Sequence, residues 1–358
     1  MSDGFMLGRI LLQFGAEATT DLTGELSAVA LTPDGYLLAG SDELLGIECL
    51  SPVAPYIYGD RRHFDLRDFL PMDKDDEIDI EGIDCTEHYL WFTGSHSSKR
   101  KNAKGKKAAK DIARLATIDH DRNRYLLARV PLLNGEPARA ITLANGCERT
   151  AAALPHQGKS NQLLEALTTD EHLGAILSID LPSKDNGFDI EALAVRGDRL
   201  FLGLRGPVLR GWAIILELAV EVAAGDRHSL QLQPIGPGDR CYRKHFLYLD
   251  GLGIRDLCFH GEDLLIVAGA TMDVAMPMRV FCLKNLLAAK GDSLTAQDSD
   301  NLSYLFDLSQ ATAPDRSEGI AIVPYLGRDS LLVIYDSALV NHGPQPGEIY
   351  ADVFRLPA

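Results

Sequence analysis

Short apolar runs alternate with polar turns along the whole chain, and one version of this pattern recurs. In the clearest copy, residues 189–195 (DIEALAV) and 200–205 (LFLGLR) flank the turn RGDR at 196–199. Two apolar runs of this length around a turn with glycine and aspartate are typical of a β-hairpin. The same pattern predicts four more hairpins, which begin near residues 27, 79, 253 and 317.

Both runs of each copy are apolar at most positions, so both faces of each sheet should be covered. Sheets stacked face to face in a closed ring meet this requirement. The repeat therefore predicts an all-β fold, a β-propeller that forms a single domain over residues 1–358. Successive copies lie 54 to 67 residues apart, except for one interval of 110 residues between positions 81 and 191. We expect six blades of about 60 residues, with five as the alternative if the long interval holds one blade and an insertion.

Other segments are predicted from their composition and flanking residues. The predicted strands are 113–118, 125–130 and 174–181, with a short helix near 161–168 and a loop at 341–347. A strand at 349–355 should close the ring by pairing with residues 7–14.

The charge of the chain is strongly uneven. It has 35 basic and 51 acidic residues, a net charge of −16 at pH 7, and seven of the basic residues lie between positions 99 and 110. An acidic chain lacks the positive field that polyphosphates require, so we expect no nucleic-acid partner. The basic run predicts a flexible, solvated insertion over residues 97–111, although such a run can also contact a phosphate-bearing ligand or a membrane surface.

No apolar run is long enough for a membrane span, and residues 1–15 do not have the pattern of a secretory signal. The six cysteines are scattered without a Cys-x-x-Cys pair, as expected for reduced thiols in a cytoplasmic protein. A protein partner remains open at this stage.

Several short motifs together resemble a known family. They are IEGI at 80–83, TGSHS at 93–97, PSKDNG at 182–187, LGLRGP at 202–207 and GIRDL at 253–257. As a set they resemble the bacterial "domain of unknown function 3616" family, over about residues 26 to 335. The resemblance implies a propeller-like fold and no established reaction. The chain is more loosely similar to esterase-like and phytase-like propellers, and more distantly to calcium-dependent lactonase propellers.

The repeat also predicts where polar residues gather. In a propeller blade the first strand starts at the face of the disc to which the second strand returns. Starts of first strands, ends of second strands and one loop should therefore meet at one mouth of the central channel. The residues at these places are Glu81, Glu191, Glu318, Arg255, Asp256, Ser95, His96, Arg205, Asp336, Lys184 and Asn186.

These residue types allow several kinds of chemistry. The carboxylates of Glu81, Glu191 and Glu318 suit a divalent cation such as calcium, which prefers oxygen ligands. Arginines suit a carboxylate or phosphate, and a histidine beside a carboxylate can act as acid and base. The candidate catalytic residues are His96, Glu191, Arg205, Arg255 and Asp256, and the candidate ligand contacts are Ser95, Lys184, Asn186 and Asp336.

A purely structural interpretation stands beside this one. Each glutamate at the start of a first strand can accept backbone N–H groups from the next blade. Arg205 and Arg255 can pair with those glutamates to neutralise buried charge.

Two functions remain open. One is a hydrolase that acts on a small anionic ester, phosphoester or lactone at the channel mouth. The other is a non-catalytic propeller that binds a ligand or a protein through the same face. The sequence shows no nucleotide-binding glycine motif, no Gly-x-Ser-x-Gly motif and no zinc spacing of Cys and His.

Overall fold

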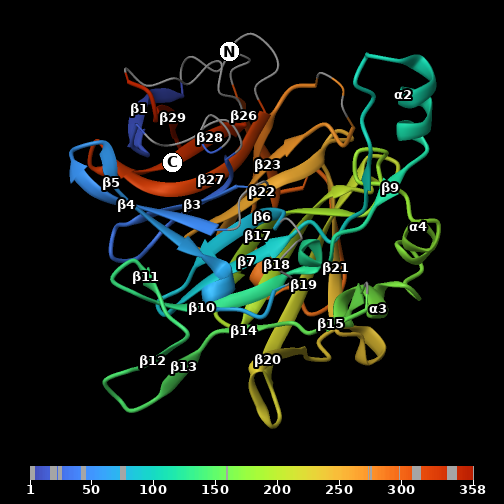
Figure 1. The fold of residues 1–358 in the computed structure, drawn as a ribbon, viewed down its shortest axis with the longest axis horizontal. Helices are drawn as coiled ribbons and strands as arrows, with labels where there is room; N and C mark the ends of the chain where they lie inside the picture. The colour runs from blue at the N-terminus through green and yellow to red at the C-terminus, as the bar shows by residue number, and fades with distance from the viewer. Residues whose placement is uncertain are drawn as a thin grey trace.

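The structure, a computed structural model, describes residues 5–16, 22, 26–41, 46–72, 78–158, 160–272, 274, 276–297, 299–308, 316–336 and 345–357, with the side chains of residues 316, 317 and 336 left out. Over these residues the chain is nearly all β, and strands of alternating direction form curled sheets around a centre (Figure 1). The fold is a β-propeller.

The strand pairings of the described residues contain five antiparallel four-stranded units, some joined to one another in larger sheets, and we call these units blades 1 to 5. Blade 1 consists of β2 (Leu26–Leu31), β3 (Leu37–Ser41), β4 (Gly46–Ala54) and β5 (Ile57–Asp65). Blade 2 consists of β6 (Ile80–Cys85), β7 (Tyr89–Gly94), β10 (Leu127–Leu133) and β14 (Ala152–Ala153). Blade 3 consists of β17 (Asp189–Arg196), β18 (Arg199–Gly206), β19 (Trp212–Ala223) and β21 (Tyr242–Tyr248).

The last two blades complete the ring. Blade 4 consists of β22 (Gly253–His260), β23 (Asp263–Gly269), β24 (Arg279–Leu283) and β26 (Leu302–Asp307). Blade 5 consists of β27 (Arg316–Tyr325), β28 (Arg328–Asp336), β29 (Glu348–Arg355) and β1 (Met6–Gln13). Because β1 is its outermost strand, blade 5 joins both ends of the chain, and the predicted pairing of residues 7–14 with 349–355 is confirmed (Figure 1).

The first strands of the blades surround the channel. They contact one another in the cycle β2–β6–β17–β22–β27–β2. Six blades are therefore not confirmed: over the described residues the cycle has five first strands, and the 110-residue interval holds one blade with insertions.

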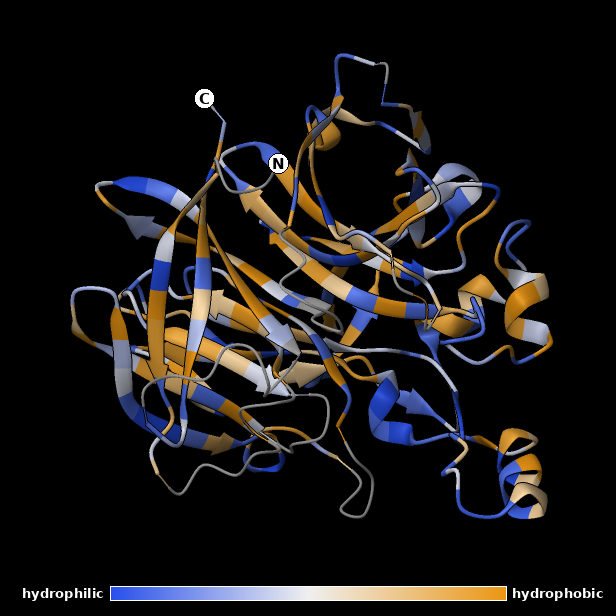
Figure 2. Cartoon of the chain, turned by 90° about the horizontal axis from the view of Figure 1, so that it is seen from above, coloured by the Kyte–Doolittle hydropathy of each residue, from blue (hydrophilic) through white to orange (hydrophobic). Residues whose placement is uncertain are grey.

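Each pair of neighbouring blades encloses its own hydrophobic cluster, and the described residues form five such clusters. Between blades 2 and 3, for example, Trp91 and Leu127 belong to one cluster with Leu193 and Leu202. Hydrophobic residues are frequent in the strands and hydrophilic residues in the connecting loops (Figure 2). Consecutive residues of β3 and β18 are buried, so both faces of these strands are covered. This is the two-sided burial that the apolar runs predict.

The remaining elements are insertions and connections. They are β8 (Lys99–Arg100), β9 (Ile118–Asp119), β11 (Glu136–Pro137), β12 (Ala140–Thr142), β13 (Glu148–Thr150), β15 (His156–Gln157), β16 (Ser160–Asn161), β20 (Asp226–Leu232), β25 (Ser293–Thr295), α2 (Ala108–Leu115), α3 (Gln162–Leu167), α4 (Gly174–Ser178), and the 3₁₀ turns η1 (Leu66–Asp68), η2 (Arg122–Tyr125), η3 (Pro237–Asp239) and η4 (Leu286–Ala288).

Two local predictions are wrong and one is confirmed. Of the segments predicted as strands, residues 113–115 form the end of α2 and residues 174–178 form α4, although residue 118 does begin β9. The helix predicted near 161–168 is α3, and the side chain of Asn161 caps it by accepting a hydrogen bond from the N–H of Leu164. The loop predicted at 341–347 lies mostly outside the described residues.

Candidate functional site

Each of the five first strands has a β-bulge at the same place. The register with the second strand shifts at one residue, and a bulge leaves that residue without a direct partner. The bulge residues of blades 1 to 5 are Ser27, Glu81, Glu191, Arg255 and Glu318. All five line one pocket, so the bulges orient these side chains toward the channel.

This channel pocket has a volume of about 80 Å³. Besides the bulge residues, it is lined by Leu26, Asp79, Lys99, Arg124, Ser183, Lys184, Asp189 and Arg205. Five of the lining residues are acidic and five are basic, so their formal charges cancel. A buried group of charges is tolerated under this condition, because each ion needs a partner to offset its desolvation.

Three arginines of the pocket form ion pairs, and two of them pair with carboxylates of their own blade. Nη2 of Arg124 lies 2.7 Å from Oδ2 of Asp79 in blade 2. In blade 3, Nη2 of Arg205 lies 2.7 Å from Oδ2 of Asp189, and Nη1 of the same arginine pairs with Glu191.

Arg255 extends this arrangement across two further blades. Its Nη1 lies 2.6 Å from Oε2 of Glu191, and its Nη2 pairs with Glu318. Charge pairing therefore runs from blade 3 through blade 4 to blade 5. The structural role proposed for Arg205 and Arg255 from the sequence is the one that their contacts support.

Burial and pairing act against each other on the pKa values of this cluster. Burial raises the pKa of Glu191 to about 8, although Arg205 and Arg255 both lower it. Burial also raises the pKa of Asp189, against the effect of Arg205. For Arg255, burial alone lowers the pKa, but Glu191 and Glu318 more than offset this, and the guanidinium stays charged.

Two lysines stand at the mouth of the pocket. Lys99 comes from β8, and Lys184 comes from the loop before β17. Both are exposed, and no ion pair connects either of them to another residue in the described part of the chain. The mouth therefore presents positive charge to solvent, whereas the arginines below are held by carboxylates.

The geometry does not fit the calcium site predicted on Glu81, Glu191 and Glu318. The guanidinium of Arg255 pairs with both Glu191 and Glu318, so it supplies the positive charge that a cation would supply. Within the described residues, no group of three or more His, Cys, Asp or Glu side chains is placed to hold a metal ion.

His96 is not among the residues that line the channel pocket. It follows β7 in a left-handed conformation (φ 54°) and lines a second cavity. Its Nδ1–H donates to the carbonyl of Gly94 at 2.9 Å, and its Nε2 accepts from the amide of Asn161 at 2.9 Å. Burial lowers the pKa of His96 to about 4, so the ring is neutral at pH 7.

Three other predicted site residues make backbone contacts and do not line the channel pocket. Asp256 accepts the N–H groups of Leu257 and Ile320, each at 2.7 Å, and so links blades 4 and 5. Oδ1 of Asn186 accepts the N–H of Val208 at 3.2 Å, and the carbonyl of Ser95 accepts the N–H of Ile190 at 2.8 Å. Asp336 ends β28, and its side chain lies outside the described part.

The structure adds residues that the sequence argument missed. Asp79 and Asp189 each precede a bulge glutamate by two residues, a repeated Asp-Ile-Glu that was a usable signal. Ser27 occupies the bulge of the degenerate copy in blade 1. Arg124 and Lys99 belong to the insertion of blade 2, outside the repeat, so no pattern pointed to them.

Comparison with known families gives one match that covers nearly the whole chain. The sequence profile of the family "Protein of unknown function (DUF3616)" matches residues 25–352. The chain belongs to this family. All the residues that line the channel pocket lie inside the matched segment.

Known structures resemble the chain only loosely. Virginiamycin B lyase from Staphylococcus aureus matches 98% of this chain and 100% of its own, with 7% identity and a TM-score of 0.36. Aldose sugar dehydrogenase from Streptomyces coelicolor matches 96% of each chain, with 10% identity and a TM-score of 0.37. Hydrazine synthase from Kuenenia stuttgartiensis matches 89% of this chain and 58% of its own, with 10% identity and a TM-score of 0.34.

These three similarities give no information about activity, because both the identities and the TM-scores are low. None of the curated proteins compared with the chain matches it. No helix in the described ranges is long and apolar enough to cross a membrane.

Proposed function

We propose that the mouth of the channel binds the anionic group of a small molecule. The observation behind this proposal is the pair of exposed lysines, Lys99 and Lys184, which line the pocket and form no ion pair within the described part of the chain. A bound anion would give these two ammonium groups the direct partner that no described carboxylate supplies. An ammonium on a flexible stem suits an anion that arrives from solvent.

The size of the pocket limits what enters it. A cavity of about 150 Å³ holds one benzene molecule, and the channel pocket is smaller, about 80 Å³. A phosphate or carboxylate group fits such a volume, and the rest of a larger ligand would extend into solvent past the lysines.

The contacts favour binding over catalysis. His96, the residue expected to act as acid and base, lines a different cavity and has hydrogen-bond partners on both ring nitrogens. The guanidinium groups of Arg205 and Arg255 are engaged by carboxylates of the protein itself. Neither arginine is free to clamp a substrate without breaking a buried ion pair.

Thermal melts with phosphate, sulfate, malonate and acetate, at constant ionic strength set with sodium chloride, test this proposal. A ligand at about one hundred times its Kd stabilises the folded state by about 2.7 kcal/mol, which is a shift of several degrees. We expect Lys184→Ala or Lys99→Ala to reduce the shift.

Lys106→Ala is the matched control, because it removes the same charge from an exposed lysine of the same insertion that does not line the pocket. If Lys106→Ala reduces the shift as much as Lys184→Ala does, the anion binds to the basic run in general and the proposal is wrong.

Hydrolysis of a small anionic ester, phosphoester or lactone is the second candidate, and Glu191 is the observation in its favour. With a pKa of about 8, a protonated Glu191 in the pocket could donate a proton to a leaving group. Turnover of p-nitrophenyl acetate, p-nitrophenyl phosphate or δ-gluconolactone should then fall as the pH rises above about 8. It should also be lost in Glu191→Gln. No turnover of any of these substrates above the buffer rate would count against catalysis.

A further inference from the structure

A second cavity lies beside the channel pocket and has about three times its volume, about 240 Å³ compared with about 80 Å³. One wall is formed by the segment after β7, and the opposite wall by α3, α4 and the residues that follow α4. The two walls differ in chemistry. The helical wall is mostly apolar, with Leu164, Ile176, Leu177 and Leu181 beside the polar Thr168 and Asp180, and Phe188 adds a ring at the edge.

The opposite wall is polar, and nearly all of it is already hydrogen-bonded. Both nitrogens of His96 have partners. The hydroxyl of Ser97 accepts from Nη2 of Arg124 at 3.0 Å. At the rim, Nε2 of His120 lies 3.0 Å from Oδ2 of Asp180. Asp180 at the rim is the one carboxylate among the described residues that line this cavity.

Ser98 is the exception on this wall. Its side chain is only 5% exposed, and its Oγ has no hydrogen-bond partner in the described part of the protein. The backbone of the residue is fixed, because its carbonyl accepts the N–H of Ser183 at 3.0 Å. A buried hydroxyl without a partner costs free energy, so a group that satisfies it is favoured there.

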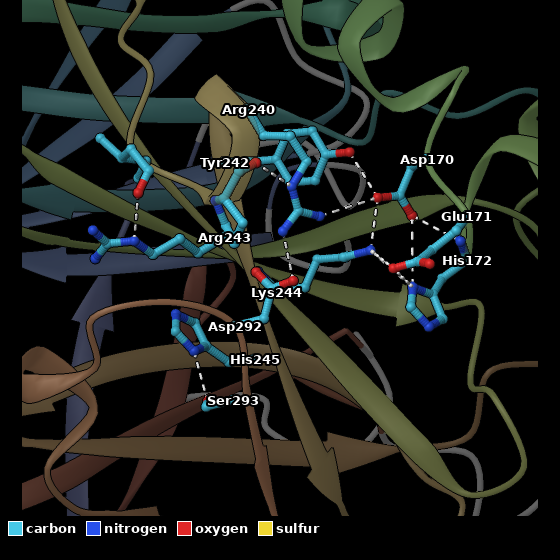
Figure 3. A network of polar contacts seen from close by, with 12 residues as sticks. Asp170, Glu171, His172, Arg240, Tyr242, Arg243, Lys244, His245, Asp292 and Ser293 are labelled. Atoms are coloured by element: carbon cyan, nitrogen blue, oxygen red, sulfur yellow. Dashed lines mark hydrogen bonds and ion pairs between the residues drawn. The ribbon is translucent and has the colours of Figure 1, made fainter.

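The helical wall is held in place by a buried ion pair. Asp170 lies between α3 and α4, and its Oδ2 is 2.7 Å from Nζ of Lys244 in β21 and accepts the hydroxyl of Tyr242 at 2.7 Å (Figure 3). Oδ1 of Asp170 also accepts the N–H groups of His172 and Leu173. The cavity thus lies between a blade and a wall that charge pairing fixes to the next blade.

We propose that this cavity is a binding site for a small uncharged molecule with a hydrocarbon ring or short chain and one oxygen, such as an alcohol or a ketone. The hydrocarbon part would pack against the leucines and Ile176, and the oxygen would accept the hydroxyl of Ser98. A cavity of about 150 Å³ holds benzene, so 240 Å³ accommodates a ring with a short substituent. This site does not depend on anion binding at the channel mouth.

Saturation-transfer NMR titrations with benzyl alcohol and toluene test the proposal. We expect both probes to bind saturably to the wild-type protein, and benzyl alcohol more tightly. Ser98→Ala should weaken benzyl alcohol by about 2- to 13-fold, the value of one hydrogen bond. The same variant should leave toluene unchanged, and its melting temperature should match the wild type because no hydrogen bond within the described protein is lost.

A pair of tryptophan variants separates this cavity from non-specific binding. Ile176→Trp should fill the cavity and abolish binding of both probes. Ile179→Trp is the matched control, since Ile179 follows the same helix, is 68% exposed and does not line the cavity. No saturable binding to the wild type, or retained binding in Ile176→Trp, would overturn the proposal. An equal effect of Ser98→Ala on both probes would refute the role of its hydroxyl.

Discussion

Arg255 lies at the bulge of β22 with its guanidinium between the carboxylates of Glu191 and Glu318. Arg255 lines the channel pocket, but its contacts are ion pairs that connect neighbouring blades. The equivalent positions in the other blades hold Ser27 and three glutamates, so Arg255 is the only basic residue among the five bulge residues. Removal of Arg255 would leave the carboxylates of Glu191 and Glu318 buried without this positive charge.

We therefore expect Arg255→Met to lower the free energy of unfolding by about 3–5 kcal/mol, the usual cost of removing one partner from a buried ion pair. Urea unfolding at pH 7 measures this change. Arg328→Met makes the same substitution in the exposed turn of blade 5 and should change stability by less than about 0.5 kcal/mol. Equal, small effects of the two substitutions would show that the ion pairs of Arg255 do not stabilise the ring.

Some residues of the site could be predicted from the sequence. The repeated position at the start of each first strand identifies Glu81, Glu191, Arg255 and Glu318, and these four do meet in one pocket. The same reasoning could not find Arg124, which pairs with Asp79 from a 3₁₀ turn outside the repeat. It also placed His96 at the mouth, because the position of a residue after a strand does not determine the direction of its side chain.

Among the elements, hairpins could be predicted and insertions could not. Each hairpin of this fold has the same sequence pattern, which is two apolar runs separated by a turn. The segments that form α2 and α4 contain apolar residues in runs too short for periodicity to separate helix from strand. The helix α3 could be predicted because its length and its Asn161 cap give it a clear beginning.

The basic insertion offers a test at this scale. Residues 102–116, which include α2, contain no buried residue, and the hydrogen bond from the N–H of Lys101 to the carbonyl of Thr117 closes the segment at its base. Replacing 102–116 with a two-residue Gly-Asn turn should therefore leave the melting temperature within about 2 °C of the wild type. Lys99 is retained in this variant, so anion binding at the channel mouth should also persist. Aggregation or a large fall in melting temperature would show that the insertion has a structural role.

The anchor of α3 and α4 predicts a dependence on acid. Burial raises the pKa of Asp170, but hydrogen bonds from Lys244 and Tyr242 more than offset this and lower the pKa from 3.8 to about 2. A carboxyl with a lowered pKa in the folded state stabilises the fold above its unfolded pKa. That contribution is lost as the pH falls through about 2.

Lys244→Met should accordingly destabilise the protein by about 3–5 kcal/mol at pH 7, because it leaves Asp170 buried without its ammonium partner. The stability difference from the wild type should shrink as the pH falls from about 4 to about 2, in urea unfolding measured across that range. Lys284→Met, at an exposed lysine, is the control and should show no such pH dependence. A difference that stays constant down to pH 2 would contradict the assignment of the anchor to Asp170.

The whole molecule combines an apolar ring of blades with a charged axis. The five hydrophobic clusters lie between neighbouring blades and stabilise the ring there. The channel pocket, in contrast, is lined mostly by polar and charged residues. The propeller could be predicted because both faces of each apolar strand need a neighbour. The number of blades could not, because spacing alone does not show whether 110 residues form two blades or one blade with insertions.

A crystal structure of the protein soaked in phosphate would show whether the channel mouth is the ligand site. We predict density for a phosphate ion within hydrogen-bond distance of the ammonium groups of both Lys99 and Lys184, with the ion pairs of Arg205 and Arg255 below it unchanged. Phosphate bound only along the lysines of residues 104–110, with none at the channel mouth, would show that the channel mouth is not the anion site.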